Sequence, residues 1–360
     1  MPPRAALRAS GGLLRRTAPT GRPCAVRGSS RASSSAAAAK PGLTPEAATA
    51  ALVRTSDHPA HLAAAFYPAA LRPHYLALRA FNVETATIKD NVSNETLGRI
   101  RVGWWRDAVR GAFDNKPSPH PTLEALRAAI HDPAVLRGGG LVEDHFLRIV
   151  DAREEDVAAP SVPPLLADIE MYAERTSSRL LYLSLNLVAL SAPELDEIFS
   201  HLGKAIGLST LLASLPHSAG FTAQSQAPIP QSGRASRSAL STQRRLALPR
   251  EYAHAHGVVE EEVYRLGPQA PGLTDAVFDT ATRANDYLIS ARTAIAQLDG
   301  GKLPELALGP LMNAIQARHY LTRLEAAQFN VFDASMQLHA QGRGWRLPWE
   351  MVRAKWRRSV

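Results

Sequence analysis

The helical spacing of apolar residues is the feature that most restricts what this chain can fold into. Large apolar side chains recur three, four or seven positions apart at Leu71, Tyr75, Leu78, Phe81 and Ile88. Residues at this spacing share one face of an α-helix, whereas a half-buried strand would alternate apolar and polar residues. Convincing alternation is absent, so the sequence predicts an all-α protein.

The same periodicity, with helix-start signals, places the expected helices along the chain. The N-cap of the first one is Thr44, because Pro45 and Glu46 follow it in the first turn. The expected helices lie at 59–89, 93–114, 121–131, 140–156, 162–190, 193–214, 272–298, 303–328 and 346–357. No run of 18 or more apolar residues occurs, so a membrane-spanning helix is not expected.

Two segments differ from this helical pattern. Residues 1–42 are rich in Arg, Ser and Ala and contain no acid, which is the composition of a mitochondrial transit peptide; a disordered tail is the alternative. Residues 216–247 are rich in Ser, Gln, Pro and Gly and are expected to form a flexible insertion. The domain itself is therefore expected to span 43–360.

Charge and cysteine content exclude several classes of function. The eight basic residues before Glu46 account for the whole net charge of +8, so the rest of the chain is formally neutral and shows no nucleic-acid footprint. The single cysteine, Cys24, lies in the leader, which excludes thiolate zinc sites and a cysteine nucleophile from the domain. The motifs HExxH, GxSxG, GxGxxG and GxxxxGK[ST] are also absent.

The stretch "FNVETATIKDNV" carries two acids, Glu84 and Asp90, on what is expected to be one helix. Six residues apart, they point about 120° away from each other around the axis. Ala86 and Thr87 share the face of Asp90, and neither has a carboxylate. A magnesium–diphosphate site needs clustered carboxylates, so partnered acids are the favoured interpretation here.

Two further segments bear on a metal site. In "IVDAREEDV", Asp151 shares a face with Glu154 and Glu155, which makes this the best remaining metal candidate, with a solvated helix face as the alternative. In "HLGKAIGLSTLLAS", Gly203 and Gly207 lie four apart and predict close approach of another helix. No acid occurs between residues 197 and 251, so the second segment offers no metal ligand.

The C-terminal segment "RGWRLPWEMVRAKWRRSV" places an aromatic stripe among basic residues. Trp345, Trp349, Val352 and Trp356 recur at helical spacing, with arginines and a lysine around them. Tryptophan favours the bilayer interface and basic residues favour anionic headgroups, so peripheral membrane contact through the three tryptophans is one interpretation. The other is a helix that packs its tryptophans into the domain.

Several ordered segments resemble the squalene/phytoene synthase superfamily. They are "ALRAFNVETATIKDNV", "IRVGWWRDAV", "YAERTSSRLLYLSL", "HLGKAIGL" and "RRLALPREY", and together they cover roughly residues 58–357. Within that superfamily the chain resembles the mitochondrial branch of complex I assembly factor 6 proteins. The resemblance implies the isoprenoid-synthase helical bundle with a central pocket.

The resemblance also shows where the two Asp-rich motifs of the synthases fall. The paired aspartates of the first fall on Ala86 and Thr87, and only its last falls on Asp90. The Gln, Asn, Arg and Asp of the second fall on Gly207, Thr210, Ala213 and Ser214. The residues expected to remain in the pocket are Glu84, Asp90, Asp156, Tyr172, Arg244 and Arg245.

The missing ligands indicate a non-catalytic protein. The resemblance to the assembly factor branch implies a role in early assembly of respiratory complex I, at the matrix side of the mitochondrial inner membrane. The implied partners are assembly intermediates or a membrane subunit of complex I, with an isoprenoid or lipid in the pocket as a further expectation. No cofactor is expected. The alternatives are a magnesium-dependent prenyl diphosphate transferase and a lipid-binding pseudoenzyme. The enzyme stays an alternative despite the missing acids, because Arg and Lys bind phosphate without metal.

Overall fold

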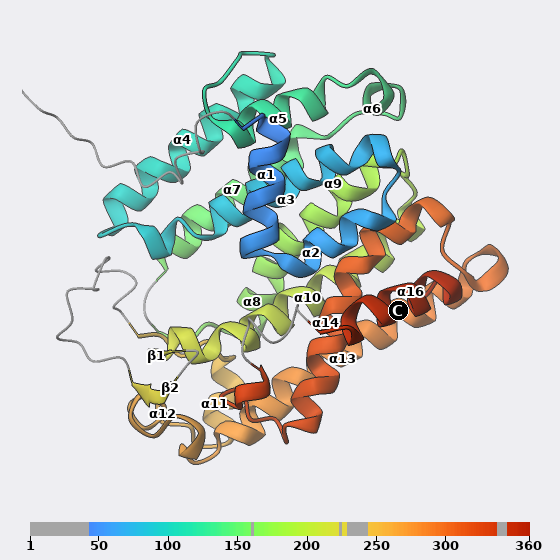
Figure 1. Cartoon of the computed structure of the whole chain (residues 1–360). Helices are drawn as coiled ribbons and strands as arrows, with labels where there is room; N and C mark the ends of the chain where they lie inside the picture. Colours follow the sequence, from blue (N-terminus) through green and yellow to red (C-terminus); the bar gives the residue numbers. More distant parts are fainter. Residues whose placement is uncertain (1–42, 160–161, 223–224, 229–243, 337–343) are drawn as a thin grey trace, which may run out of the picture. The chain divides into compact units, whose positions relative to one another are not determined.

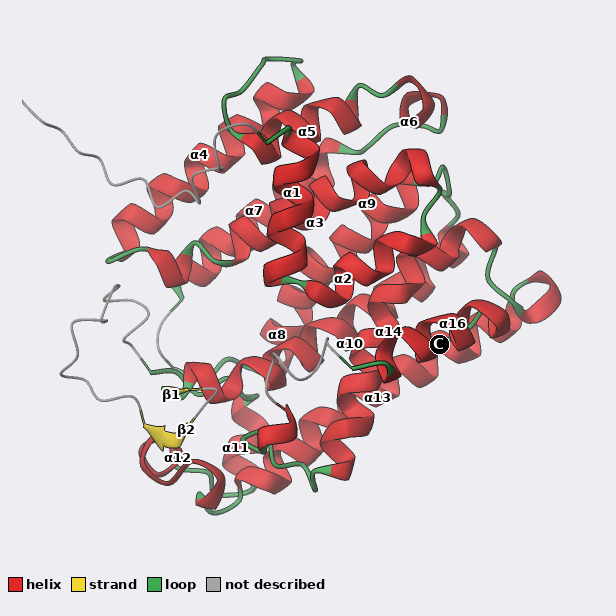
Figure 2. Ribbon diagram, viewed as in Figure 1, coloured by secondary structure: helices red, strands yellow, loops and turns green. Residues whose placement is uncertain are grey.

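A computed structural model describes residues 43–159, 162–222, 225–228, 244–336 and 344–360 (Figure 1). The predicted transit peptide, 1–42, lies outside these residues. Figure 2 shows that helices make up most of the described chain and that loops connect them. The α-helices are α1 (Pro45–Ser56), α2 (His58–Ala63), α3 (Arg72–Ala86), α4 (Glu95–Phe113), α5 (Pro121–Ile130), α6 (Pro133–Arg137), α7 (Glu143–Ala158), α8 (Leu166–Ala173), α9 (Arg179–Leu187), α10 (Pro193–Ser218), α11 (Arg250–Ala255), α12 (Glu260–Leu266), α13 (Leu273–Gln297), α14 (Leu308–Ala326) and α16 (Arg346–Arg357).

The all-α prediction is confirmed, and the predicted ranges differ from the observed helices mainly at breaks. Thr44 caps α1, where its hydroxyl accepts a hydrogen bond from the Ala47 amide at 3.3 Å. The range predicted as one helix over 59–89 is divided at Tyr67, which is extended because Pro68 follows it. A π-helical turn, Glu174–Ser178, joins α8 to α9 within the range predicted over 162–190. Helices α6, α11 and α12 were not predicted.

Helix α10 packs against α8, the π-helical turn, α13 and α14. It is long and apolar enough to cross a membrane by length and composition, and half of the tested window is buried within the protein. Ten of its residues are buried, among them Phe199, Leu208 and Leu215. These contacts fit the central helix of a packed domain.

The predicted insertion at 216–247 is described only at its two ends. Helix α10 continues through Pro216 to Ser218, and a short antiparallel pair follows, β1 (Phe221–Thr222) with β2 (Ser225–Pro228). At the other end Leu246 is fully buried. The structure therefore moves both boundaries inward, and the interior, 229–243, lies outside the described residues.

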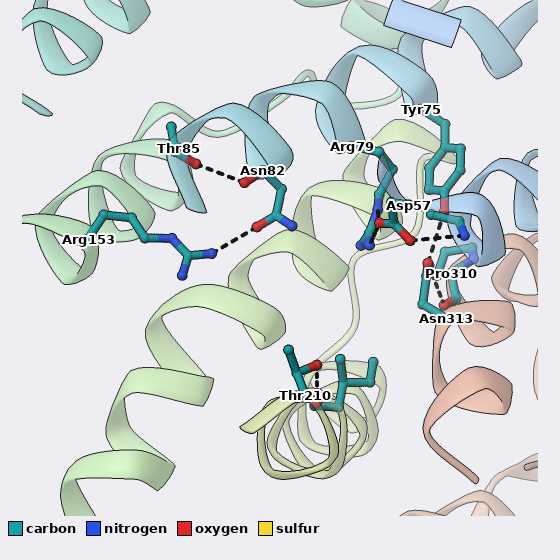
Figure 3. Close-up of polar contacts among 11 residues, drawn as sticks. Asp57, Tyr75, Arg79, Asn82, Thr85, Arg153, Thr210, Pro310 and Asn313 are labelled. Carbon is teal, nitrogen blue, oxygen red and sulfur yellow. Dashed lines mark hydrogen bonds and ion pairs between the residues drawn. The ribbon is translucent and has the colours of Figure 1, made fainter. Parts of the chain in front are cut away.

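The buried face of α3 determines where its polar face points. Phe81 packs edge-on against Phe146 of α7, with ring centroids 5.3 Å apart, and against Trp105 of α4 at 5.6 Å. Near the start of the same helix, Tyr75 donates a hydrogen bond to Asn313 of α14 at 2.9 Å (Figure 3). This packing holds α3 in one orientation and turns Asn82 toward α7.

Candidate functional site

Five residues from four parts of the chain form what we call the Asp156 network: Lys89, Arg153, Asp156, Tyr172 and Arg245. Asp156 accepts hydrogen bonds from Lys89 Nζ at 3.1 Å and from Arg245 Nη1 at 2.9 Å. Arg153 donates to the Tyr172 hydroxyl. Helices α7 and α8, the turn after α3 and the segment before α11 thus meet at one polar cluster.

Arg153 connects this network to α3. One turn before Asp156 on α7, it donates to the Asn82 side-chain oxygen at 3.1 Å (Figure 3). Its Nε is buried and has no hydrogen-bond partner among the described residues. Because it bonds to both Asn82 and Tyr172, this guanidinium ties α3 to α7 and α8.

Charge balance explains the protonation states in the network. Burial by itself would raise the pKa of Asp156, but the neighbouring Lys89 and Arg245 outweigh it, and the pKa lies below the ordinary value. Burial raises the pKa of the Tyr172 hydroxyl, with Arg153 acting in the opposite direction. Asp156 is therefore an ionised partner of two cations, which leaves it poorly available to a metal ion.

Asp90 lies close to this network, in a different local structure from the predicted one. Helix α3 ends at Ala86, and Asp90 lies in a separate 3₁₀ turn, Lys89–Asn91, so the assumption of one continuous helix over 81–92 was wrong. Burial raises the pKa of Asp90, and the nearby Asp156 adds to that, while His217 at the end of α10 lowers it. No ion pair to Asp90 is found within the described residues.

Glu84 points to a different part of the molecule. Its carboxylate accepts a hydrogen bond from the Thr122 hydroxyl at 3.0 Å, and its other oxygen lies 3.3 Å from His120 Nε2. Burial raises the pKa of Glu84 to about 7, with the Thr122 hydrogen bond opposing. Glu84 thus contributes to the contact between α3 and the start of α5, and it is not part of the Asp156 network.

Arg244 was predicted with Arg245 but turns away from the network. Its Nη1 donates to the backbone oxygen of Tyr264 at 3.2 Å, and its guanidinium carbon lies 5.9 Å from the centre of that ring. Its side chain also lies against Gly220, where an added Cβ would come within 2.9 Å of Arg244 Nε. Of the six predicted pocket residues, the structure joins Asp156, Tyr172 and Arg245 and places Asp90 nearby.

Sequence reasoning missed Asn82, Lys89 and Arg153, although a signal for them existed. The search looked for clustered acids, whereas these residues lie beside the acids in the quoted motifs and carry the opposite charge or none. Arg153 is three residues before Asp156, which places it on the same face of α7. A search for cations at helical spacing around each acid would have found it.

The predicted metal candidate on α7 is wrong, because arginines occupy its carboxylates. Arg106 of α4 lies 2.8 Å from Asp151 and 2.5 Å from Glu154. Arg175 binds Glu155 through both terminal nitrogens, at 2.5 and 2.8 Å. The spacing that brought these acids onto shared faces serves cross-helix ion pairs.

Helix α10 carries the positions of the second synthase motif and contributes no charge there. A Cβ on Gly203 would lie 2.5 Å from Ser178 Cα, and one on Gly207 would lie 2.3 Å from Ala173 Cβ, so the predicted close approach is confirmed. Thr210 donates to the Ile206 oxygen of its own helix at 2.7 Å (Figure 3). Ser214 bonds to Leu211 in the same way.

Magnesium, which the fold implies for the synthases, does not fit the donors in the described part of the chain. No group of three or more His, Cys, Asp or Glu residues arranged to hold a metal is found there. Ala86 and Thr87 supply no carboxylate, and Asp156 is neutralised by Lys89 and Arg245. The residues therefore favour an anion or an internal charge network over a divalent cation.

The C-terminal tryptophans point outward, which excludes the packed alternative. Trp345, Trp349 and Trp356 are 74%, 57% and 78% exposed, while Leu347 and Met351 of the same helix are buried. The buried residues of α16 face α14 and α2. A solvent-exposed aromatic stripe is consistent with contact to a lipid or protein surface.

The fold belongs to the class of squalene synthases. The crystal structure of squalene synthase HpnC from Alicyclobacillus acidocaldarius matches with a TM-score of 0.60 and 15% identity, covering 79% of this chain and 95% of that one. Residues 53–353 match the squalene/phytoene synthase family model, and the chain therefore belongs to the squalene/phytoene synthase family.

Curated relatives carry a more specific name. The rat protein "NADH dehydrogenase (ubiquinone) complex I, assembly factor 6" is 30% identical over 286 residues, which cover 79% of this chain and 75% of that protein. The Drosophila melanogaster homolog of that assembly factor is 30% identical over 291 residues, covering 77% and 75%. The family predicted from the quoted motifs is confirmed.

Proposed function

We propose that this protein is an assembly factor for respiratory complex I and does not catalyse prenyl transfer. The observation that carries the proposal is the 30% identity to the rat assembly factor over three quarters of that protein's length. Similarity of this extent covers 79% of this chain, which is most of the helical domain. It supports a shared role better than a likeness confined to one motif would.

The arrangement of the site supports the non-catalytic part of the proposal. Ionisation of a prenyl diphosphate by magnesium requires carboxylates on two sides of a pocket. Here α10 has no acid after Glu197, and Asp156 is held between Lys89 and Arg245. The Asp156 network binds α3, α7 and α8 to one another, which is a structural role.

Loss of the gene tests the proposal directly. Cells without the protein are expected to contain less assembled complex I on native gels, with the other respiratory complexes at normal levels. Re-expression of the wild-type chain should restore complex I, and so should an Asp90→Ala variant if no catalysis is involved. Normal complex I in the deletion cells would rule the proposal out.

The synthase-type alternative rests on the family match over residues 53–353. It predicts turnover when the purified protein is incubated with magnesium and labelled farnesyl or geranylgeranyl diphosphate. We expect no turnover. Product that disappears in the Asp90→Ala variant would establish the enzyme instead, whereas binding without turnover would establish a lipid-binding pseudoenzyme with its ligand in the central pocket.

We propose the matrix side of the mitochondrial inner membrane as the place of action. The assembly role of the relatives supports the organelle. The exposed Trp345, Trp349 and Trp356 support peripheral membrane contact. Flotation with vesicles tests the contact. The wild-type chain should float with the vesicles, and a variant with all three tryptophans changed to Ser should stay at the bottom of the gradient.

A further inference from the structure

A cavity of about 450 Å³ lies beside the C-terminal helix, away from the Asp156 network. Its volume falls within the range of small-ligand sites. The described residues that line it come from α14, from the stretch 327–335 and from 344–347 at the start of α16; among them are Arg323, Asp333, Trp345 and Arg346. Figure 1 shows α14 and α16 beside each other, and the two helices are in contact.

Two arginines of this cavity form no ion pair among the described residues. Neither Arg323 nor Arg346 makes an ion pair in the part of the chain that the structure describes. By contrast, Arg318, which lies on α14 with Arg323, pairs with Glu350 at 3.3 Å. Burial, and then the positive charge of Arg346, lower the pKa of Arg323, while the nearby Asp333 acts in the opposite direction. Two like charges side by side at a cavity wall are stabilised by a bound anion.

The acids close to the cavity are already engaged. Asp333 accepts a hydrogen bond from the Ser335 amide at 2.8 Å, which turns its carboxylate into the local turn. Glu350 lies between Arg318 and His319 and is 3.0 Å from the His319 ring. An anion that enters the cavity therefore meets two guanidinium groups that form no ion pair within the described residues, with Asp333 as the carboxylate in the cavity lining.

The residues around the cavity indicate which kind of anion it would bind. Trp345 lines the cavity and is 74% exposed, and Trp349 continues the aromatic stripe one turn further along α16. The outer surface of α16 and its end also carries four more basic residues: Arg353, Lys355, Arg357 and Arg358. Aromatic side chains beside cations match the boundary between headgroups and acyl chains of an anionic bilayer.

We infer that the cavity between α14 and α16 binds the phosphate group of an anionic phospholipid, with Arg323 and Arg346 as its ligands. The planar guanidinium groups donate paired hydrogen bonds to the phosphate oxygens, while Trp345 and Trp349 lie against the acyl chains. This inference rests on the membrane contact proposed above and adds a defined headgroup site to it.

The test uses the full chain and flotation with vesicles of phosphatidylcholine, with and without phosphatidylglycerol. Changing both Arg323 and Arg346 to Lys keeps the charge but removes the paired hydrogen-bond geometry, so binding to phosphatidylglycerol vesicles should weaken about fivefold. The matched control changes Arg353 and Arg357 to Lys. Both lie on α16 outside the cavity, and this variant should bind like the wild type. Thermal unfolding confirms that both variants fold.

Equal binding by the Arg323→Lys, Arg346→Lys variant and the wild type would overturn the headgroup site, and membrane contact through the tryptophans would stand. If the wild-type chain does not float with either vesicle, the membrane contact itself fails. Inorganic phosphate provides the other arm. If it raises the melting temperature of the wild type but not of the Lys variant, while vesicle binding is unchanged, the cavity binds free phosphate and the lipid assignment is wrong.

Discussion

The Asp156 network and helix α10 satisfy their polar groups in opposite ways. In the network, Asp156 bonds to Lys89 and Arg245, which are 67 and 89 positions away in the sequence. On α10, Thr210 and Ser214 bond to their own helix, and Gly203 replaces side-chain contact by backbone contact. The comparison shows that ion pairs stabilise the Asp156 network, whereas close packing of backbones stabilises α10.

Breaking the close packing on α10 should have the largest effect. In Gly203→Ala, the new Cβ would lie 2.5 Å from Ser178 Cα, so the backbone must shift. We expect the free energy of unfolding to fall by about 3 kcal/mol. The control is Gly103→Ala on α4, where nothing lies within 4 Å of the new Cβ and helix propensity should add about 0.5–1 kcal/mol. Urea unfolding measures both, and equal stability of the two variants would contradict the packing role.

Breaking the charge network comes next. Asp156→Asn leaves Lys89 and Arg245 without their counter-charge in a half-buried place, so we expect a loss of about 2 kcal/mol at pH 7. The control is Asp107→Asn, whose side chain is 82% exposed and which should change the free energy of unfolding by under about 0.5 kcal/mol.

The pH dependence gives a second readout of the same change. Because the pKa of Asp156 is lowered in the folded state, its contribution to stability is present above the unfolded value of about 3.9 and is lost as the pH falls through the folded value. The wild-type advantage over Asp156→Asn should therefore disappear in acid. An advantage that stays constant down to pH 2 would show that the carboxylate charge is not what matters.

Glu84 provides a smaller effect with the opposite sign. Its pKa is raised to about 7 by burial, so ionisation destabilises the fold progressively from about pH 4.3 up to about pH 7. Glu84→Gln should be more stable than the wild type by about 1–2 kcal/mol at pH 8 and nearly equal to it at pH 4. Denaturation at both pH values checks this, with the exposed Glu261→Gln as control. A wild type that gains stability relative to Glu84→Gln as the pH rises would refute it.

Magnesium should have the smallest effect. Since the described residues hold no three-ligand group, about 5 mM magnesium should move the melting temperature by less than about 1 °C. Differential scanning fluorimetry with and without chelator measures it, and potassium at the same ionic strength is the control. A magnesium-specific rise that Asp90→Ala abolishes would restore the synthase-type site.

The sequence determined the helical class and the contacts that depend on one helix at a time. Apolar periodicity located α4, α5, α7, α10, α13 and α16, because the spacing of the apolar residues within a helix determines which face it buries. The same local rule identified Gly203 and Gly207 as a place of close approach. It also placed the three C-terminal tryptophans on one face of a single helix.

Only the tertiary structure decided which partner each polar residue has. Nothing local indicates that Asp156 meets Lys89 and Arg245, that Glu84 belongs to Thr122, or that the tryptophans of α16 face solvent. A helix specifies the direction of a side chain but not the helix that will lie opposite. That depends on how all the apolar faces pack together, so the electrostatic partners follow from the assembled core.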